Sequence, residues 1–232
     1  MSLLIRIDVD RPYGRTPLAR HLLSRVSSDL YFPRVKGFGY LTELETILTW
    51  LNEASAPAYV FFRRCTLPSE PLLKLLDDGQ HEIGMHLENS RSYETFLEEK
   101  QMLETHAGRR VRSVSKHGSG GSKYGFHHYA PYEPQRYVEW AARSSMSLFL
   151  GNLEDPTLEA TRVGSSLSVF PAAFWLEPYW RDTNKFTIDW LLTNAKQRDV
   201  VLLVHPENVL ADSSLVADFK KLITSLESRI LS

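Results

Sequence analysis

Aspartate and histidine residues stand at the ends of four apolar runs in this chain. Asp8 and Asp10 end the first run, His86 and His117 end two later runs, and His205 ends the last one. One carboxylate and two imidazoles are a common set of ligands for a divalent metal ion. Each run is short enough to be a β-strand, and catalytic residues collect at the carboxyl ends of strands in barrel enzymes. The sequence therefore predicts a metal-dependent enzyme.

The two aspartates share one face of their strand, because side chains alternate between the faces of a strand. They stand about 6–7 Å apart, while Ile7 and Val9 point toward covering helices. One carboxylate can bind a metal ion and the other can act as a base, but spacing alone does not tell Asp8 from Asp10. Arg6 lies on the same face and is a competing partner. An Asp-x-Asp pair can also cap a strand, but two buried acids with two matching histidines favour a metal site.

Strands and helices alternate along the chain and position these residues. Strands are expected at 3–10, 58–62, 81–87, 111–117, 147–151, 167–170 and 200–205, and helices at 42–55, 69–76, 93–106, 133–144, 186–196 and 214–226. Alternation with short connections is typical of a parallel sheet or barrel, here of about seven strands. A length of 232 residues fits one domain. We therefore predict an α/β fold in a single domain over 1–232.

Composition excludes several classes of partner. The formal net charge is −1, with 27 Lys and Arg against 28 Asp and Glu, and the chain has no basic block. We therefore expect no nucleic acid partner. Cys65 is the only cysteine, so no internal disulfide is expected. No apolar run approaches ~20 residues, and the first residues lack the pattern of a signal peptide, so we expect a cytoplasmic protein without a membrane span. The oligomeric state is not indicated.

The run from 80 to 86, Gln-His-Glu-Ile-Gly-Met-His, resembles a motif of the NodB-homology polysaccharide deacetylases, carbohydrate esterase family 4. That motif reads Gly-His-Glu-Ile-Gly-x-His, and its last histidine, here His86, is a metal ligand. The acidic pair at the start and the apolar strand that ends at His205 also resemble family motifs. The resemblance implies a distorted (β/α) barrel, one divalent ion and hydrolysis of an N-acyl group. Zinc is the expected ion, with Mn, Co, Ni and Fe as alternatives.

Three departures make the chain resemble a divergent branch of this family. Val9 separates two acids that are adjacent in the family, and Ser90 stands where a second ligand is usual. His117 must then supply the second imidazole. The arginine motif that follows the fourth strand is replaced by Lys-His-Gly-Ser-Gly at 116–120. These differences affect the expected substrate more than the expected fold.

The residues and the resemblance together suggest one mechanism. Asp10, His86 and His117 hold the ion, and Asp8 takes a proton from water as the general base. His205 protonates the departing amine, which leaves poorly as an anion. A buried histidine that only caps the last strand is the other interpretation of His205.

Further residues are expected to flank the substrate. Arg64 follows Arg63 at the end of a strand, and one of the two could bind a phosphate; a solvated pair of charges is the alternative. Glu88 shares the face of His86, where it would contact the substrate or support a ligand, unless it is a solvated loop acid. Trp180 flanks a rim loop, although tryptophans are more often part of the core.

Other polar residues receive looser assignments. His128 follows His127 in an aromatic segment, where it would line the sugar site or replace a ligand, unless the segment is an ordinary surface loop. His81 is expected to be a partly exposed hydrogen-bonding residue. The charged run 98–100 is expected to be a solvated helix face, and Cys65 to be inert.

Two functions follow from these expectations. The first is a hydrolase that removes an acetyl or formyl group from an amino sugar, carried by a nucleotide or a lipid, as the resemblance implies for bacterial surface-polysaccharide synthesis. The second is a non-catalytic carbohydrate-binding protein on the same barrel. Ser90 and the missing arginine motif favour the second, whereas a pure binding protein needs neither Asp8 nor His205. The sequence names neither the sugar nor the acyl group.

Overall fold

The computed structural model describes residues 3–31 and 37–231, so residues 1, 2, 32–36 and 232 of the predicted domain lie outside it. Its strands are β1 (Leu3–Val9), β2 (Ala58–Phe62), β3 (Glu82–Leu87), β4 (Ser113–Lys116), β5 (Leu148–Leu153), β6 (Thr161–Val163), β7 (Leu167–Ala172), β8 (Phe174–Trp175) and β9 (Val200–Val204). Its helices are α1 (Leu18–Leu30), α2 (Thr42–Glu53), α3 (Glu70–Asp78), α4 (Tyr93–Ala107), α5 (Pro134–Arg143), α6 (Ile188–Asn194), α7 (Pro206–Val209) and α8 (Ser213–Ser225), with 3-10 turns η1 (Arg64–Thr66) and η2 (Pro178–Trp180).

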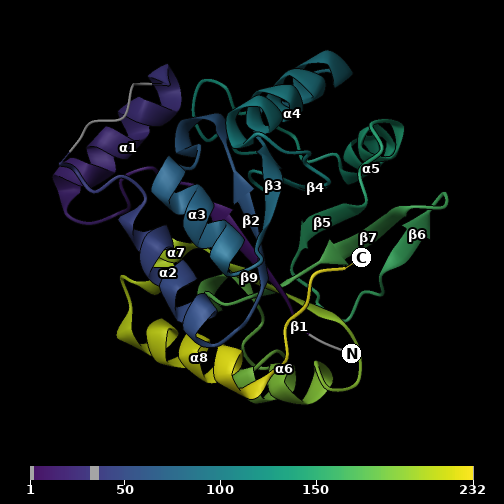
Figure 1. The fold of residues 1–232 in the computed structure, drawn as a ribbon. Helices are drawn as coiled ribbons and strands as arrows, with labels where there is room; N and C mark the ends of the chain where they lie inside the picture. Colours follow the sequence, from purple (N-terminus) through teal and green to yellow (C-terminus); the bar gives the residue numbers. More distant parts are fainter. Residues whose placement is uncertain (1–2, 32–36, 232) are drawn as a thin grey trace.

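The strands form one curled sheet with helices packed outside it (Figure 1). Their order is β6-β7-β5-β4-β3-β2-β1-β9-β8, and every neighbouring pair is parallel except β6 and β7. The expected α/β barrel is therefore present as a half-barrel, with nine strands in place of about seven. The two strands at the ends of the sheet were not expected. β6 has three exposed residues and β8 has only two residues, so neither shows the alternation of apolar and polar residues that predicts a strand.

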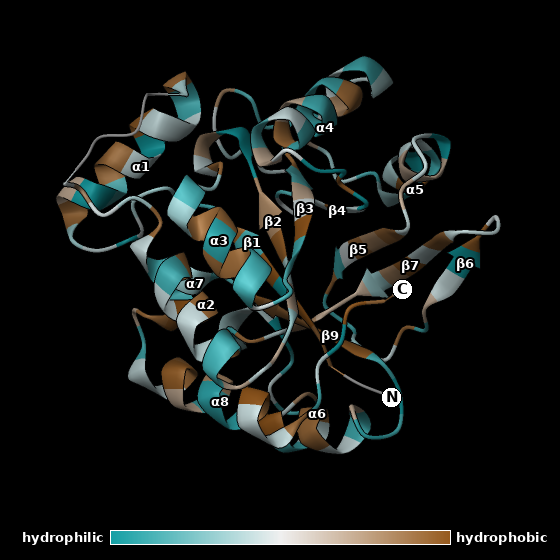
Figure 2. Ribbon diagram, viewed as in Figure 1, coloured by the Kyte–Doolittle hydropathy of each residue, from teal (hydrophilic) through white to brown (hydrophobic). Residues whose placement is uncertain are grey.

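The outer face of the sheet holds the larger core. Ile5, Ile7 and Val9 of β1 pack there, as expected from strand parity, with apolar side chains of the covering helices such as Leu44 and Leu48 of α2. Figure 2 shows brown, hydrophobic bands among teal and white ones on the helices that cover the sheet. Burial on this face fixes the register of β1, because a slip of one residue would turn Ile7 toward the concave face and Asp8 toward the covering helices.

The concave face of the sheet is apolar at one end and polar at the other. Leu4 of β1 packs with Tyr59, Phe61 and neighbours on this face, and the C-terminal Leu231 closes over them. Arg6 and Asp8 follow on the same face of β1, and both are buried. The polar side chains therefore begin where the strands approach their carboxyl ends.

One helix breaks the usual pattern. α1 was not expected from the sequence, because its buried residues are Ser24 and Ser27 whereas Leu18 and Leu22 are exposed. A helix that packs through serines gives no apolar stripe toward the core, which is the feature used to recognise amphipathic helices.

Candidate metal centre and active site

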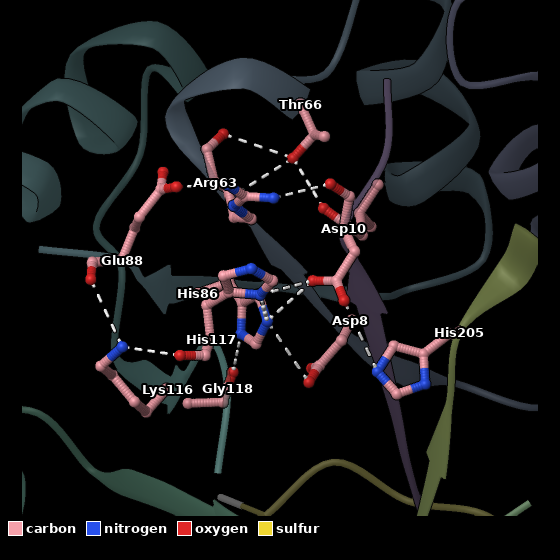
Figure 3. A network of polar contacts seen from close by, with 12 residues as sticks. Asp8, Asp10, Arg63, Thr66, His86, Glu88, Lys116, His117, Gly118 and His205 are labelled. Atoms are coloured by element: carbon pink, nitrogen blue, oxygen red, sulfur yellow. Dashed lines mark hydrogen bonds and ion pairs between the residues drawn. The ribbon is translucent and has the colours of Figure 1, made fainter. Parts of the chain in front are cut away.

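Five of the side chains singled out in the sequence meet at the carboxyl ends of four strands (Figure 3). Asp8 lies in β1 and Asp10 directly follows it. His86 lies near the end of β3, and His117 and His205 directly follow β4 and β9. Parallel pairing brings these ends to the same edge of the sheet, and its curl brings β3 and β4 round toward β1. The fold thus collects residues that are nearly 200 positions apart.

Asp10, His86 and His117 form a compact group of donor atoms that could hold a metal ion. Asp10 Oδ1 lies 3.1 Å from His86 Nε2 and 2.9 Å from His117 Nδ1, and the two nitrogen atoms are 3.3 Å apart. Ligand atoms about 2.0–2.2 Å from a tetrahedral zinc ion are about 3.3–3.6 Å from one another. The three separations are at or slightly below this range, so the group fits a small divalent ion.

The hydrogen bonding of Asp10 also fits a cation site. Asp10 Oδ1 is buried, and no group in residues 3–31 or 37–231 donates to it a hydrogen bond of normal geometry, although two imidazole nitrogens are close. A buried carboxylate oxygen without a hydrogen bond costs free energy unless a cation binds it. Burial raises the pKa of Asp10, but the nearby His117 and His86 outweigh it and hold the pKa well below its usual range. The carboxylate is therefore ionised, as a metal ligand must be.

Both histidines are held in a ligand-ready state. His86 Nδ1 lies 2.7 Å from Ser115 Oγ, which leaves Nε2 facing Asp10. Burial and the charge of Arg63 lower the pKa of His117 to about 4. The imidazole of His117 is therefore neutral near pH 7, and the neutral ring is the form that binds metal ions.

Asp8 lies beside this group and is paired with Arg6. Arg6 Nε and Nη2 donate to the two carboxylate oxygens of Asp8 at 2.9 and 2.6 Å, and Asp8 Oδ2 lies 3.6 Å from His86 Nε2. Burial raises the pKa of Asp8, but the charge of Arg6 and its hydrogen bonds help to lower it below its usual value. The competing partner expected on this face is therefore real, and it orients Asp8 without removing it from the site.

Arg6 is itself fully buried and fully engaged. Its Nη1 donates to the carbonyl oxygens of Leu150 and Gly151 at 3.1 and 2.8 Å, and its Nη2 donates to Asn152 Oδ1 at 2.8 Å. A buried guanidinium is tolerated only when its donors are satisfied in this way. Of the two acids at the end of β1, Arg6 contacts Asp8.

His205 lies on the other side of Asp10 and is paired with Glu177. Its Nδ1 is 2.8 Å from Glu177 Oε1, and its Nε2 points to the site, 3.8 Å from Asp10 Oδ2. Asn208 Nδ2 donates to the same Glu177 oxygen at 3.0 Å. Burial lowers the pKa of His205, but Glu177, Asp10 and Asp8 outweigh it and raise the pKa to about 10. In this arrangement His205 carries a proton at neutral pH.

Arg63 and Glu88 form a buried ion pair behind the ligands. Arg63 Nη2 donates to Glu88 Oε1, and its Nη1 donates to the Asp10 carbonyl at 2.8 Å. Thr66 Oγ1 donates to the Val9 carbonyl at 2.9 Å, so two bonds fix the backbone at the end of β1. The interpretations of Arg63 as a solvated charge and of Glu88 as a solvated loop acid are therefore wrong, because each neutralises the other inside the protein.

The carbonyl group of His117 is held from two sides. Lys116 Nζ lies 2.6 Å from this oxygen, and His128 Nε2 donates to it at 2.8 Å. Gly118 follows with φ +76°, and a Cβ atom there would lie 2.8 Å from His128 Nε2. His128 also accepts a hydrogen bond from the Tyr124 amide, so it is buried and occupied. It supports His117 and does not replace a ligand, and its position behind the site rules out the surface-loop interpretation.

The charged run 98–100 also differs from the expectation. Glu99 is half-buried and accepts hydrogen bonds from the Glu88 and Asn89 amides at 2.9 and 2.7 Å. Burial raises its pKa to about 7. Glu99 therefore anchors the loop after β3, where the expectation was a solvated helix face.

An aromatic series leads from His205 to the surface. The ring centroids of His205 and Trp175 are 5.7 Å apart, and those of Trp175 and Trp180 are 5.7 Å apart. Trp180 is 39% exposed and its ring contacts that of Tyr179. Trp180 is thus partly exposed and is not a core residue. Arg64 is exposed, with its guanidinium 4.4 Å from the Tyr31 ring centroid.

The remaining histidines and Ser90 lie away from the donor group. His81 is buried, so the expectation of partial exposure is wrong: Nδ1 accepts from the Ala58 amide and Nε2 lies 2.7 Å from Asn52 Oδ1. Ser90 is buried against Tyr137 Oη at 3.2 Å. His127 stacks on Tyr31, with 4.1 Å between ring centroids. Cys65 is buried and free, in keeping with its expected inertness.

Two buried carboxylates of the site were missed in the sequence. Glu177 is fully buried, and Glu207 is buried at the start of α7, where burial and the charge of Asp10 raise its pKa to about 7. Glu207 stands two positions after His205, a spacing that could have singled it out. Glu177 has no such indication, because it lies in a segment between β8 and η2 with no periodic pattern.

Neither family models nor curated proteins match this sequence. Solved structures do match the fold. An allantoinase, Puue, superposes with a TM-score of 0.59 at 12% identity, covering 95% of this chain and 82% of that one. A Parabacteroides distasonis protein described as a glycoside hydrolase/deacetylase gives 0.50 at 8% identity, with 96% and 66% covered. A CE4 family pseudoenzyme from Bacillus anthracis gives 0.48 at 14% identity, with 95% and 60% covered.

These likenesses show the fold. The chain has a NodB-like half-barrel fold, as the sequence motifs predicted, and the solved structures that share it include an allantoinase and a protein described as a glycoside hydrolase/deacetylase. In the part of the chain that the structure describes, no helix combines the length and apolar character needed to cross a bilayer.

Proposed function

We propose that this protein is a metal-dependent amide hydrolase that removes an N-acetyl or N-formyl group from an amino sugar carried on a nucleotide or a lipid. The observation that carries the proposal is the Asp10, His86 and His117 group, flanked on one side by an ionised Asp8 and on the other by a protonated His205. Two groups whose pKa values are pushed apart by their surroundings form an acid and base pair.

Asp10, His86 and His117 are the proposed ligands, and three protein ligands with an open position are typical of catalytic zinc. When bound, a divalent ion supplies a Lewis acid that lowers the pKa of water and polarises an amide carbonyl. Zinc is our first choice, because two imidazoles and one carboxylate suit it. Ser115 supports this assignment, since its bond to His86 Nδ1 directs Nε2 toward the other donors.

Asp8 is the proposed general base. Its two bonds to Arg6 keep it ionised at neutral pH, and its Oδ2 is 3.6 Å from His86 Nε2, so it lies at the edge of the donor group. It takes a proton from the attacking water as the new C–O bond forms. Arg6 lowers the basicity of Asp8, but it fixes the carboxylate in position, which is a requirement for general-base catalysis.

His205 is the proposed general acid. Its Nε2–H faces the site, and Glu177 accepts from Nδ1–H and holds the imidazolium. As the C–N bond breaks, Nε2 gives its proton to the amine nitrogen, so a neutral amine and a carboxylic acid leave. An ion bound at Asp10 lowers the pKa of His205 from the value set by the carboxylates alone, toward the range in which proton transfer is efficient.

Four residues are proposed to act around the substrate. Trp180 offers an exposed ring for a sugar face, and Arg64 offers an exposed guanidinium for a phosphate. Glu88 and His128 act indirectly, through the backbone of Asp10 and of His117.

The test joins metal analysis to a substrate screen. Purified protein is loaded with zinc, dialysed and measured for metal per chain by mass spectrometry. It is then assayed by release of acetate or formate from acylated amino sugars, free and as nucleotide or lipid conjugates, with allantoin as a cyclic amide comparison. One ion per chain and turnover that disappears in Asp8→Asn support the proposal. Sugar binding without turnover of any amide would instead support the non-catalytic carbohydrate-binding alternative.

A further inference from the structure

Helix α1 presents its apolar side chains to solvent. Leu18, Leu22, Val26 and Leu30 follow one another at intervals of four residues and are 71, 54, 44 and 66% exposed. Residues four apart lie on the same side of a helix, so these side chains form one ridge. Figure 1 shows α1 at the periphery of the molecule, and Figure 2 shows brown bands along it. A ridge of this length is not a scatter of single exposed residues, and it indicates an interaction site.

The ridge continues into the loop that follows His117. Asp29 Oδ1 accepts from the Phe126 amide at 2.9 Å, so the loop is fixed to the C-terminal end of α1. Phe126 and Tyr124 are 67 and 47% exposed. The Tyr124 ring lies 5.8 Å from the His117 ring, measured between centroids. Exposed apolar side chains are therefore present on α1, on the loop fixed to it and beside the candidate metal site.

The charges beside the ridge are positive. Arg25 is exposed within α1, and Lys123 is exposed in the loop. Asp29 is the only acid within α1, and it is engaged by the loop. An apolar face bordered by arginine and lysine is typical of a helix that lies in the headgroup region of an anionic membrane. The net charge of the whole chain is −1, so this positive border is a local feature.

We propose that α1 and the 124–126 loop dock on an anionic lipid surface, which holds the active site over an amino sugar attached to a lipid. The leucine ridge and Phe126 enter the boundary between headgroups and acyl chains, while Arg25 reaches the phosphates. The lipid-attached substrate rests on the proposed hydrolase function; the docking surface itself does not.

A second copy of the chain is the other candidate for this face, and charge argues against it. In a two-fold dimer the same patch faces itself, so two helices that cross near their centres bring Arg25 close to its symmetry mate. Two arginines in an apolar contact repel each other, and no exposed acid of α1 is available to pair with them. Lipid phosphates provide the opposite charge.

The test is sedimentation with vesicles, and it needs no turnover. Wild-type protein, the double variant Leu18→Glu/Leu22→Glu and a matched control, Leu97→Glu/Leu158→Glu, are mixed with vesicles of phosphatidylcholine alone or with phosphatidylglycerol. The control changes two exposed leucines elsewhere and adds the same negative charge. We expect wild type and control to bind the anionic vesicles, and the Leu18/Leu22 variant to bind at least about tenfold more weakly. Arg25→Ala should weaken binding about fivefold.

The outcomes separate the two proposals. All variants are exposed-surface changes, so they should keep the wild-type melting temperature and any turnover of a soluble amide. Failure of the wild type to bind anionic vesicles overturns the docking proposal, as does equal binding by the Leu18/Leu22 variant. Self-association of the wild type that the same variant abolishes, without vesicle binding, assigns the face to a second copy. Absence of amide hydrolysis in every variant counts against the proposed function and leaves the vesicle result readable.

Discussion

The pairing of His205 with Glu177 gives a prediction that separates acid catalysis from simple positioning. Glu177→Gln keeps the size of the side chain and removes its charge. Glu177 is the largest of the influences that raise the pKa of His205 to about 10, and burial opposes them. Without that charge, we expect the pKa of His205 to fall toward its ordinary value of 6.5. A bound metal ion lowers the pKa in wild type and variant alike, so the difference between them is the quantity to test.

The magnitude follows from the fraction of His205 that is protonated. For the site without a bound ion, this fraction at pH 8 is about 99% for a pKa of about 10 and about 3% for a pKa of 6.5, so roughly thirtyfold is the largest difference expected. At pH 5.5 the two fractions are nearly equal, because His205 is then mostly protonated in both proteins. The variant should therefore lose up to roughly thirtyfold in amide hydrolysis at pH 8 and little at pH 5.5, with metal content unchanged.

The assay is a pH–rate profile of an N-acyl amino sugar and of an aryl acetate, for both proteins at equal metal content. The alkaline limb of the amide profile should move to lower pH in the variant. The aryl acetate profile should move much less, because a phenolate leaves without a proton. An amide profile whose alkaline limb stays in place, with the same loss of rate at every pH, would refute the acid role and leave Glu177 as a structural residue.

Three further predictions test the site and its surroundings. Asp8→Asn should keep the metal and lose about 10²–10⁴-fold in turnover, as expected for loss of a general base. Asp10→Asn should lose the metal. Metal analysis of both variants tests this, and the opposite pattern would reverse the two assignments. His205→Ala should slow amide hydrolysis far more than aryl acetate hydrolysis; equal losses on the two substrates mean that His205 is not the acid. Burial lowers the pKa of His81 to about 4, so below pH 6.5 the unfolded chain takes up a proton that the folded chain does not. Stability is therefore lost as the pH falls from 6.5 toward 4, by about 2 kcal/mol from this residue at pH 5. Urea unfolding at pH 7.5 and 5 should show a smaller loss in His81→Asn, and an unchanged loss contradicts the argument.

The polar residues at the strand ends could be predicted from the sequence because each one stands at the end of an apolar run. β1, β3 and β9 each combine a buried apolar run with an acid or a histidine at the end, and strand parity placed Asp8 with Arg6 and opposite Ile7. The grouping of Asp10, His86 and His117 followed from one fact, that parallel strands end at one edge. The assignment of catalytic roles within that group remains a prediction.

The missed features depend on long-range partners. Glu177 becomes part of the site only through His205, 28 positions later, and no periodic pattern marks it. Glu88 is buried because Arg63 neutralises it, and each alone has the composition of a surface loop. α1 could not be recognised because its leucines face solvent and its serines face the protein. In each case the residue type was visible, but the partner that decides its environment was not.

The position of β1 has a consequence for synthesis of the protein on the ribosome. β1 is made before the other strands of the sheet, yet it pairs on one edge with β2 and on the other with β9, which is made after all of them. Until residue 204 has left the ribosome, one edge of β1 has unpaired backbone groups, and the ion pair of Arg6 and Asp8 lies beside a gap in the sheet. Unpaired strand edges and exposed apolar surface promote association between nascent chains. Production of this protein should therefore depend on chaperones that shield the first strands, and fusion partners that slow release of the C-terminal strand should lower its yield.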